Sequence, residues 1–187
     1  MSYNIHQVDT SNVINSIQHS IDNKETCAYF MDDPKTFAFV PMSWDDQERF
    51  SEYGITGYKL FYDTEPGRGI IIVSPGDLSF LAMRPYDETK TICGEFEEDM
   101  IDFIKSRFPN AQFNGNDIVI NNRKIIGTAS NIIDGMSLFM FIASFNDNSE
   151  LISELCNPGH DNKIPSYIDS SILSKEEFKN EIISWLQ

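Results

Sequence analysis

The chain has 187 residues, and its 29 aspartates and glutamates outnumber its 14 lysines and arginines, which gives a net charge of −15. That length suits one domain, and a hydrophobic fraction of 41% is enough for a core, so a globally disordered chain is excluded. A chain this acidic lacks the basic surface that nucleic acid binding requires, and anionic lipid repels it. We therefore expect neither nucleic acid nor a membrane as a partner.

The sequence also indicates a compartment. The first residues, Met1–Thr10, are polar and carry no signal-peptide pattern, and no apolar run reaches the roughly 18 residues of a membrane span. Cys27, Cys93 and Cys156 form neither an even set nor a CxxC pair, so reduced thiols are expected rather than disulfides or a zinc site. These features together predict a cytoplasmic protein.

The first half of the chain predicts one clear helix and several short strands. Val13, Ile17 and Ile21 recur at helical spacing, so a helix is expected over Ser11–Asn23. A second, polar helix is compatible with Trp44–Tyr53. The segments with strand character are Cys27–Met31, Thr36–Val40, Tyr58–Tyr62, Ile70–Val73 and Ser79–Met83.

The second half predicts a helix followed by a hairpin. The segment Glu95–Phe108 carries one apolar face and acidic residues in its first turn, and Pro109 ends it. Two apolar runs then flank the pair Asn121-Asn122, which is typical of a tight β-turn. We therefore expect strands over Asp117–Ile120 and Lys124–Ala129.

The remaining elements complete an alternating pattern of helices and strands. Leu138–Ala143 is expected to be a buried strand, and a short helix ends before Pro158. The last helix is expected over Lys175–Leu186, because Ser174 and Glu177 have the spacing of a capping box. Hairpin turns join several strands, so the sheet should be mixed or largely antiparallel.

Two segments have the composition of a ligand site. The first is the loop Gly67-Arg68-Gly69, which leads into the apolar run Ile70–Val73. Glycine lets a backbone approach a ligand closely and present its N–H groups to an anion. A plain hairpin turn is the alternative interpretation of this loop.

The second segment places a lysine at the start of a strand. Lys124 precedes an apolar run that ends at Gly127, within the stretch Asn116–Ala129. An ammonium group in a pocket here could polarise an acyl carbonyl and neutralise a phosphate. The alternative is a hairpin lysine that points into water.

Taken together and in this order, the two segments resemble the catalytic domain of the biotin and lipoate protein ligases, most closely the lipoate–protein ligases. The second segment carries most of this resemblance, with Asn116, Asp117, Lys124, Gly127 and Thr128 in register with the family pattern. The resemblance implies an α/β domain of the α+β type, whose mixed, largely antiparallel sheet is flanked by helices. It would span residues 1–187 as a single catalytic domain, without the accessory C-terminal domain of some members.

The resemblance also implies a reaction. Such enzymes join a carboxylic acid, here lipoate or octanoate, to ATP as an acyl adenylate, and then transfer the acyl group to a lysine of an acceptor protein domain. Lys124 would be the catalytic residue that grips the acyl carbonyl and the phosphate, and Asp117 would help to hold Mg²⁺. The residues expected to bind the ligands are Gly67, Arg68, Gly69, Asn116, Asp117, Gly127 and Thr128.

Three departures from the family pattern keep a second function open. The paired arginines of the family fall on Asp63 and Thr64, the middle glycine of its loop falls on Arg68, and its histidine falls on Val73. A diverged, catalytically inactive member that binds a small molecule or a protein would fit these changes. Cys156 lies near the position of the thiol in the related octanoyl transferases but out of register, so a buried structural cysteine is preferred there.

Overall fold

The structure is a computed structural model, and it describes residues 2–9, 12–31, 37–39, 56–58, 71–73, 76–89, 94–114, 117–148 and 164–187. The helix expected over Trp44–Tyr53 and the short helix expected before Pro158 lie outside these residues. None of the helices in the described ranges is long and apolar enough to cross a membrane.

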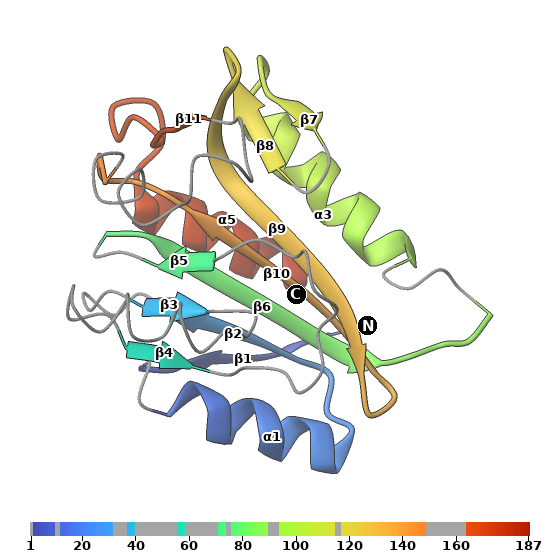
Figure 1. Ribbon diagram of the computed structural model, residues 1–187. Coiled ribbons are helices and arrows are strands. Elements are labelled where there is room, and N and C mark those ends of the chain that lie inside the picture. The colour runs from blue at the N-terminus through green and yellow to red at the C-terminus, as the bar shows by residue number, and fades with distance from the viewer. Residues whose placement is uncertain are drawn as a thin grey trace.

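A mixed sheet forms the centre of the described chain (Figure 1). Its strands lie side by side in the order β1 (Asn4–Gln7), β2 (Cys27–Met31), β6 (Leu78–Pro85), β10 (Met136–Ala143), β9 (Arg123–Ile133), β8 (Asp117–Ile120) and β7 (Gln112–Asn114), and β11 (Ile164–Pro165) pairs with β9. The β1–β2 and β11–β9 pairs are parallel, and the other pairs are antiparallel. The expectation of a mixed, largely antiparallel sheet is therefore confirmed.

A second, smaller sheet contains three strands in the order β4 (Thr56–Tyr58), β3 (Phe37–Phe39) and β5 (Ile71–Val73). Figure 1 shows it in front of the main sheet, on the side opposite the C-terminal helix α5 (Lys175–Leu186). The described strand β4 begins at Thr56, two residues before the segment expected from the sequence.

Two helices pack on one face of the main sheet. Met100 and Ile104 of α3 (Gly94–Arg107) and Phe178 and Ile182 of α5 are fully buried there. They belong to one apolar cluster with alternate residues of the central strands, which include Phe80, Ala82, Phe139 and Phe141. This alternation is what a strand with one face turned towards a helix layer requires. We refer to this side of the main sheet as the helix face.

The last helix has the bounds that the sequence predicts. The backbone N–H of Glu177 donates to Ser174 Oγ at 3.2 Å, and the backbone N–H of Ser174 donates to Glu177 Oε2 at 3.0 Å. This reciprocal pair is the expected capping box, and it satisfies two backbone donors at the start of the helix.

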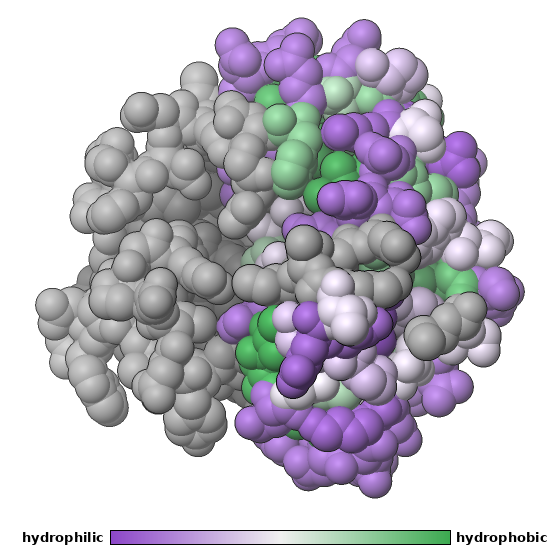
Figure 2. Space-filling model, turned by 90° about the vertical axis from the view of Figure 1, so that its right-hand side faces the viewer, coloured by the Kyte–Doolittle hydropathy of each residue, from purple (hydrophilic) through white to green (hydrophobic). Residues whose placement is uncertain are grey.

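Helix α1 (Val13–Asn23) covers part of the other face of the main sheet. Its residues Ile17 and Ile21 are buried in a second cluster with Tyr29, Leu81 and other residues of β2, β6 and β10. Figure 2 shows mainly hydrophilic residues at the lower end of the molecule, where this helix lies, because its remaining sides face solvent. We call this side of the main sheet the α1 face.

Two hairpins build the strand that carries Lys124. Asn121 and Asn122 form the turn between β8 and β9 with positive φ angles of 52° and 60°, as the asparagine pair predicts. Asp134 and Gly135 form the next turn with φ angles of 47° and 73°, and this turn was not anticipated. As a result β9 extends to Ile133, beyond the expected end at Ala129.

A buried polar network under α1 predicts sensitivity to alkaline pH. Tyr29 Oη lies 2.6 Å from Ser20 Oγ and donates to the carbonyl of Ser16 at 2.9 Å. Burial raises the pKa of Tyr29 to about 12, and burial also raises the pKa of the Cys27 thiol. Both groups therefore hold their protons more tightly in the folded state than in the unfolded state.

The free energy of unfolding should consequently fall as the pH rises. The contribution of Tyr29 is complete below about pH 10, the ordinary value for tyrosine, and is lost as the pH approaches 12. Urea unfolding between pH 8 and 11.5 measures this slope. Tyr29→Phe should flatten it and Tyr167→Phe, at a side chain that is 42% exposed, should leave it unchanged. Equal slopes for wild type and Tyr29→Phe would contradict the assignment.

Candidate active site

The β8–β9 hairpin brings together three of the residues expected to form a site. Asp117 pairs with Gly127 across the two strands, and Val119 pairs with Lys124. The register shifts between Ile118 and Val119, so β9 carries one extra residue, a β-bulge, at Ile125.

The bulge determines the side of the sheet on which Lys124 lies. In a regular strand side chains alternate, so Lys124 would share the face of Ile126, which is fully buried on the helix face. The extra residue reverses this, and Lys124 joins Asp117 and Gly127 on the α1 face. Ile125 and Ile126 are both buried in the cluster on the helix face, so the bulge buries two consecutive apolar residues and leaves the lysine outside it.

An ion pair joins the lysine to the aspartate. Lys124 Nζ lies 2.8 Å from Asp117 Oδ1, and the Asp117 side chain is only 8% exposed whereas that of Lys124 is 36% exposed. An ion pair of this length is a charge-assisted hydrogen bond, stronger than a bond between neutral groups. The ammonium group is therefore held at a defined place while part of the side chain stays accessible.

The backbone of Lys124 is paired with a neighbouring strand on each side. β8 lies on one side, and on the other Pro165 of β11 pairs with Lys124. The N–H of Ser166 donates to the Lys124 carbonyl at 2.8 Å. A strand paired on both edges is a rigid support for a side chain that must be positioned accurately.

The structure separates Thr128 from these three residues. Thr128 pairs with Phe141 and is buried on the helix face, where its neighbour Ser130 donates to Glu97 of α3 at 3.4 Å. Gly67, Arg68, Gly69 and Asn116, which the sequence also assigns to the site, lie outside the described residues, as does Cys156. Their roles stay predictions.

The described residues do not supply a complete metal site. No group of three or more histidine, cysteine, aspartate or glutamate side chains within these ranges could hold an ion. Asp117 offers a hard oxygen ligand, but its Oδ1 atom already faces the Lys124 ammonium.

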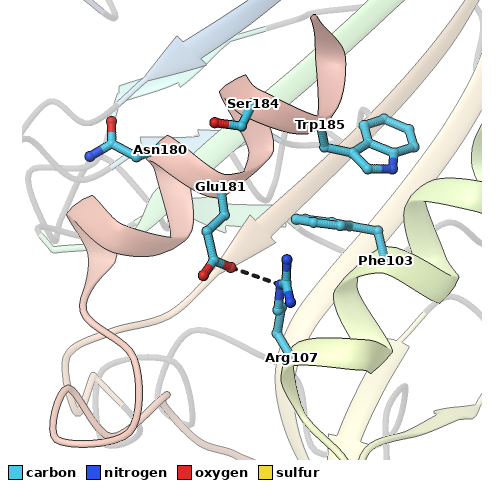
Figure 3. Close-up of a pocket in the computed structure, with 6 residues that line it drawn as sticks. All are labelled: Phe103, Arg107, Asn180, Glu181, Ser184 and Trp185. Atoms are coloured by element: carbon cyan, nitrogen blue, oxygen red, sulfur yellow. Dashed lines mark ion pairs between the residues drawn. The ribbon is translucent and has the colours of Figure 1, made fainter.

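A surface hollow of about 430 Å³ lies on the other side of the molecule, between α3 and α5 (Figure 3). Phe103 and Trp185 form its aromatic wall, with ring centroids 5.6 Å apart. The Cζ atom of Arg107 lies 4.9 Å from the centroid of the Phe103 ring. Arg107 Nε is ion-paired with Glu181 Oε2 at 2.8 Å. The hollow is on the helix side, so it is separate from the Lys124–Asp117 pair.

Comparison with solved structures identifies the architecture. A structure from the archaeal lipoylation system of Thermoplasma acidophilum, a bi-partite lipoate protein ligase and its E2 lipoyl domain, aligns with a TM-score of 0.73 at 15% identity. The alignment covers 98% of this chain and 82% of that chain. The chain has the lipoate–protein ligase fold. A lipoate-protein ligase A bound with ATP aligns with a TM-score of 0.67 at 15% identity, over 98% of this chain and 83% of that one.

The biotin branch shares this ligase fold. The biotin protein ligase of Leishmania major in complex with biotinyl-5-AMP aligns with a TM-score of 0.55 at 13% identity, over 98% of this chain and 73% of that one. No family model and no curated protein matches the sequence. The fold that the sequence resemblance implied is therefore confirmed by three-dimensional similarity at low sequence identity.

Proposed function

We propose that this protein is a cytoplasmic lipoate–protein ligase-like acyltransferase. It activates a carboxylic acid, lipoate or octanoate, with ATP and transfers the acyl group to a lysine of an acceptor protein. The observation that carries the proposal is the partly exposed Lys124 side chain, whose ammonium group Asp117 holds beside Gly127 on a chain with the ligase fold. The sequence resemblance assigns the catalytic role to this same lysine.

The proposed reaction has two steps. A carboxylate oxygen of the acid attacks the α-phosphorus of ATP, the bond to pyrophosphate breaks, and an acyl adenylate forms. The neutral amine of the acceptor lysine then attacks the acyl carbonyl, AMP leaves, and the amine loses a proton to solvent. In both steps negative charge develops on oxygen atoms, and a fixed ammonium group stabilises such charge by roughly 3 kcal/mol.

The structural neighbours support the proposed ligands. One was solved with ATP, another belongs with an E2 lipoyl domain, and a third contains biotinyl-5-AMP. By analogy we assign this chain a small carboxylic acid and ATP as substrates and a protein domain as the acceptor. Mg²⁺ would accompany ATP as its counter-ion, and Asp117, whose Oδ1 atom is paired with Lys124, could offer it no more than the other carboxylate oxygen.

A second function follows from what the sequence has lost. Asp63 and Thr64 replace two arginines of the family pattern and Val73 replaces its histidine, while Asp117 already neutralises the charge of Lys124. A site that lacks these family residues, and whose lysine is already paired with an aspartate, would suit a binding module that no longer activates ATP. The enzyme is preferred because the positions of Asp117, Lys124 and Gly127 are retained together.

Incubation with ATP, Mg²⁺ and lipoate or octanoate separates the two functions. The enzyme predicts AMP formation that depends on the acid, together with an acyl adenylate detectable by mass spectrometry. A binding module predicts a higher melting temperature with the acid and no AMP. Absence of acid-dependent AMP over a range of carboxylic acids would contradict the proposed activity.

A further inference from the structure

Gly127 leaves a space that another side chain fills. A Cβ atom placed on Gly127 would lie 2.9 Å from Cε and 3.0 Å from Nζ of Lys124, and 3.6 Å from Asp117 Oδ1. Carbon atoms that are not bonded to each other make favourable contacts at about 3.5–4.0 Å, so the first two contacts are too close for a real methyl group. The end of the Lys124 side chain therefore rests on the bare backbone of Gly127.

The backbone conformation of Gly127 does not itself require glycine. The described glycines with positive φ are Gly76 and Gly135, and Gly127 is not among them. It lies within the regular pairing of β9 with β10, opposite Ile142. Glycine inside a strand weakens the strand, and the path of the backbone does not need it here. The described structure gives one physical reason for this glycine, the room that it leaves for the end of the Lys124 side chain.

We infer that Gly127 is a positioning residue for Lys124, an inference that takes its catalytic meaning from the proposed function. The bulge at Ile125 turns Lys124 onto the α1 face, Asp117 holds the ammonium group, and the missing side chain at Gly127 lets that group lie low against the strand. The place of the positive charge is thus fixed before a ligand arrives.

Replacing Gly127 by alanine should move the lysine and leave the fold intact. The atoms that would clash are at the flexible end of the Lys124 side chain, which can turn away, whereas its backbone is held by β8 and β11. The added methyl group therefore weakens the Lys124–Asp117 contact without disturbing the sheet. Asp117→Asn removes the charge of the partner and should release the ammonium group in the same way.

Trace labelling with acetic anhydride measures how firmly the Lys124 amino group is held, because an amino group held in an ion pair reacts more slowly than a free one. Lys105 is an internal reference: its side chain is 37% exposed, against 36% for Lys124, and its partner Asp102 lies 3.5 Å away but is 77% exposed. Gly127→Ala and Asp117→Asn are each expected to raise the Lys124-to-Lys105 labelling ratio by about threefold. Ala129→Gly, two residues along the same strand on the same face, should leave the ratio unchanged.

A folded Gly127→Ala protein with the wild-type labelling ratio would overturn the inference. A double-mutant cycle provides a second measurement. Gly127→Ala should raise the urea midpoint of unfolding more in a Lys124→Ala background than in wild type, because the methyl group then meets no lysine. Equal shifts in the two backgrounds would also overturn it. Neither measurement uses ATP or an acid, so their outcome is independent of the AMP assay.

Discussion

Replacing Lys124 by alanine should lower the rate of acid-dependent AMP formation by roughly 100- to 1,000-fold. Loss of one fixed donor that stabilises developing negative charge has an effect of that size in enzymes. The effect should fall on kcat, because Lys124 is proposed to contact the reacting oxygens more strongly in the transition state than in the bound substrates. Steady-state measurement of AMP release with saturating ATP and octanoate tests this expectation.

Lys105→Ala is the matched control for this experiment. Lys105 has nearly the same exposed fraction and also pairs with an aspartate, but it lies on α3, away from the candidate site. Its replacement should leave the rate unchanged. Because Lys124→Ala removes the ion-pair partner of the buried Asp117 carboxylate, the folded fraction of each variant must be measured at the assay temperature. An equally active, folded Lys124→Ala protein would show that the catalytic assignment is wrong.

Replacing Phe178 by alanine should destabilise the protein by about 3–5 kcal/mol, the range for truncation of a buried phenylalanine. Phe178 is fully buried, and its ring centroid lies 5.8 Å from Phe108, 6.0 Å from Phe141 and 6.2 Å from Phe145. It therefore joins α5 both to the end of α3 and to the central strand β10. Urea or guanidinium unfolding of the variant measures the loss.

Phe113→Ala makes the same chemical change at a position that is 39% exposed, on the edge strand β7. Its effect on the free energy of unfolding should stay below about 1 kcal/mol, as is usual for surface positions. If both variants lost the same free energy, α5 would not be fixed to the sheet by the aromatic cluster around Phe178.

The three helices of the described residues, α1, α3 and α5, could be predicted from the sequence because their signals are local. The Ser174–Glu177 capping box gave the start of α5 without error, and apolar spacing gave α1 and α3 to within two residues. The strands β1 and β7 could not be found in this way. Both lie at edges of the main sheet, and β1 is mostly polar, so pairing with a neighbour rather than a hydrophobic pattern creates it.

The sequence grouped Asp117, Lys124 and Gly127, and the structure brings these three together, but their geometry could not be predicted. Regular alternation would have placed Lys124 on the helix face with Ile126 and Thr128, away from Asp117. The bulge at Ile125 instead turns Lys124 to the α1 face, beside Asp117 and Gly127. The two consecutive isoleucines did not signal the bulge, because a regular strand with both faces covered also carries consecutive buried apolar residues, as β2 does.

The pairing of Lys124 with Pro165 has a consequence for how the protein is made. The two residues lie much farther apart in the sequence than the residues of the β8–β9 hairpin, so their contact closes a longer loop than the hairpin does. During synthesis the hairpin that holds Lys124 leaves the ribosome before β11 does, and its outer edge stays open until then. Until then Lys124 is supported by β8 but not by β11, so residues 164–165 complete the support of the lysine that is proposed to be catalytic.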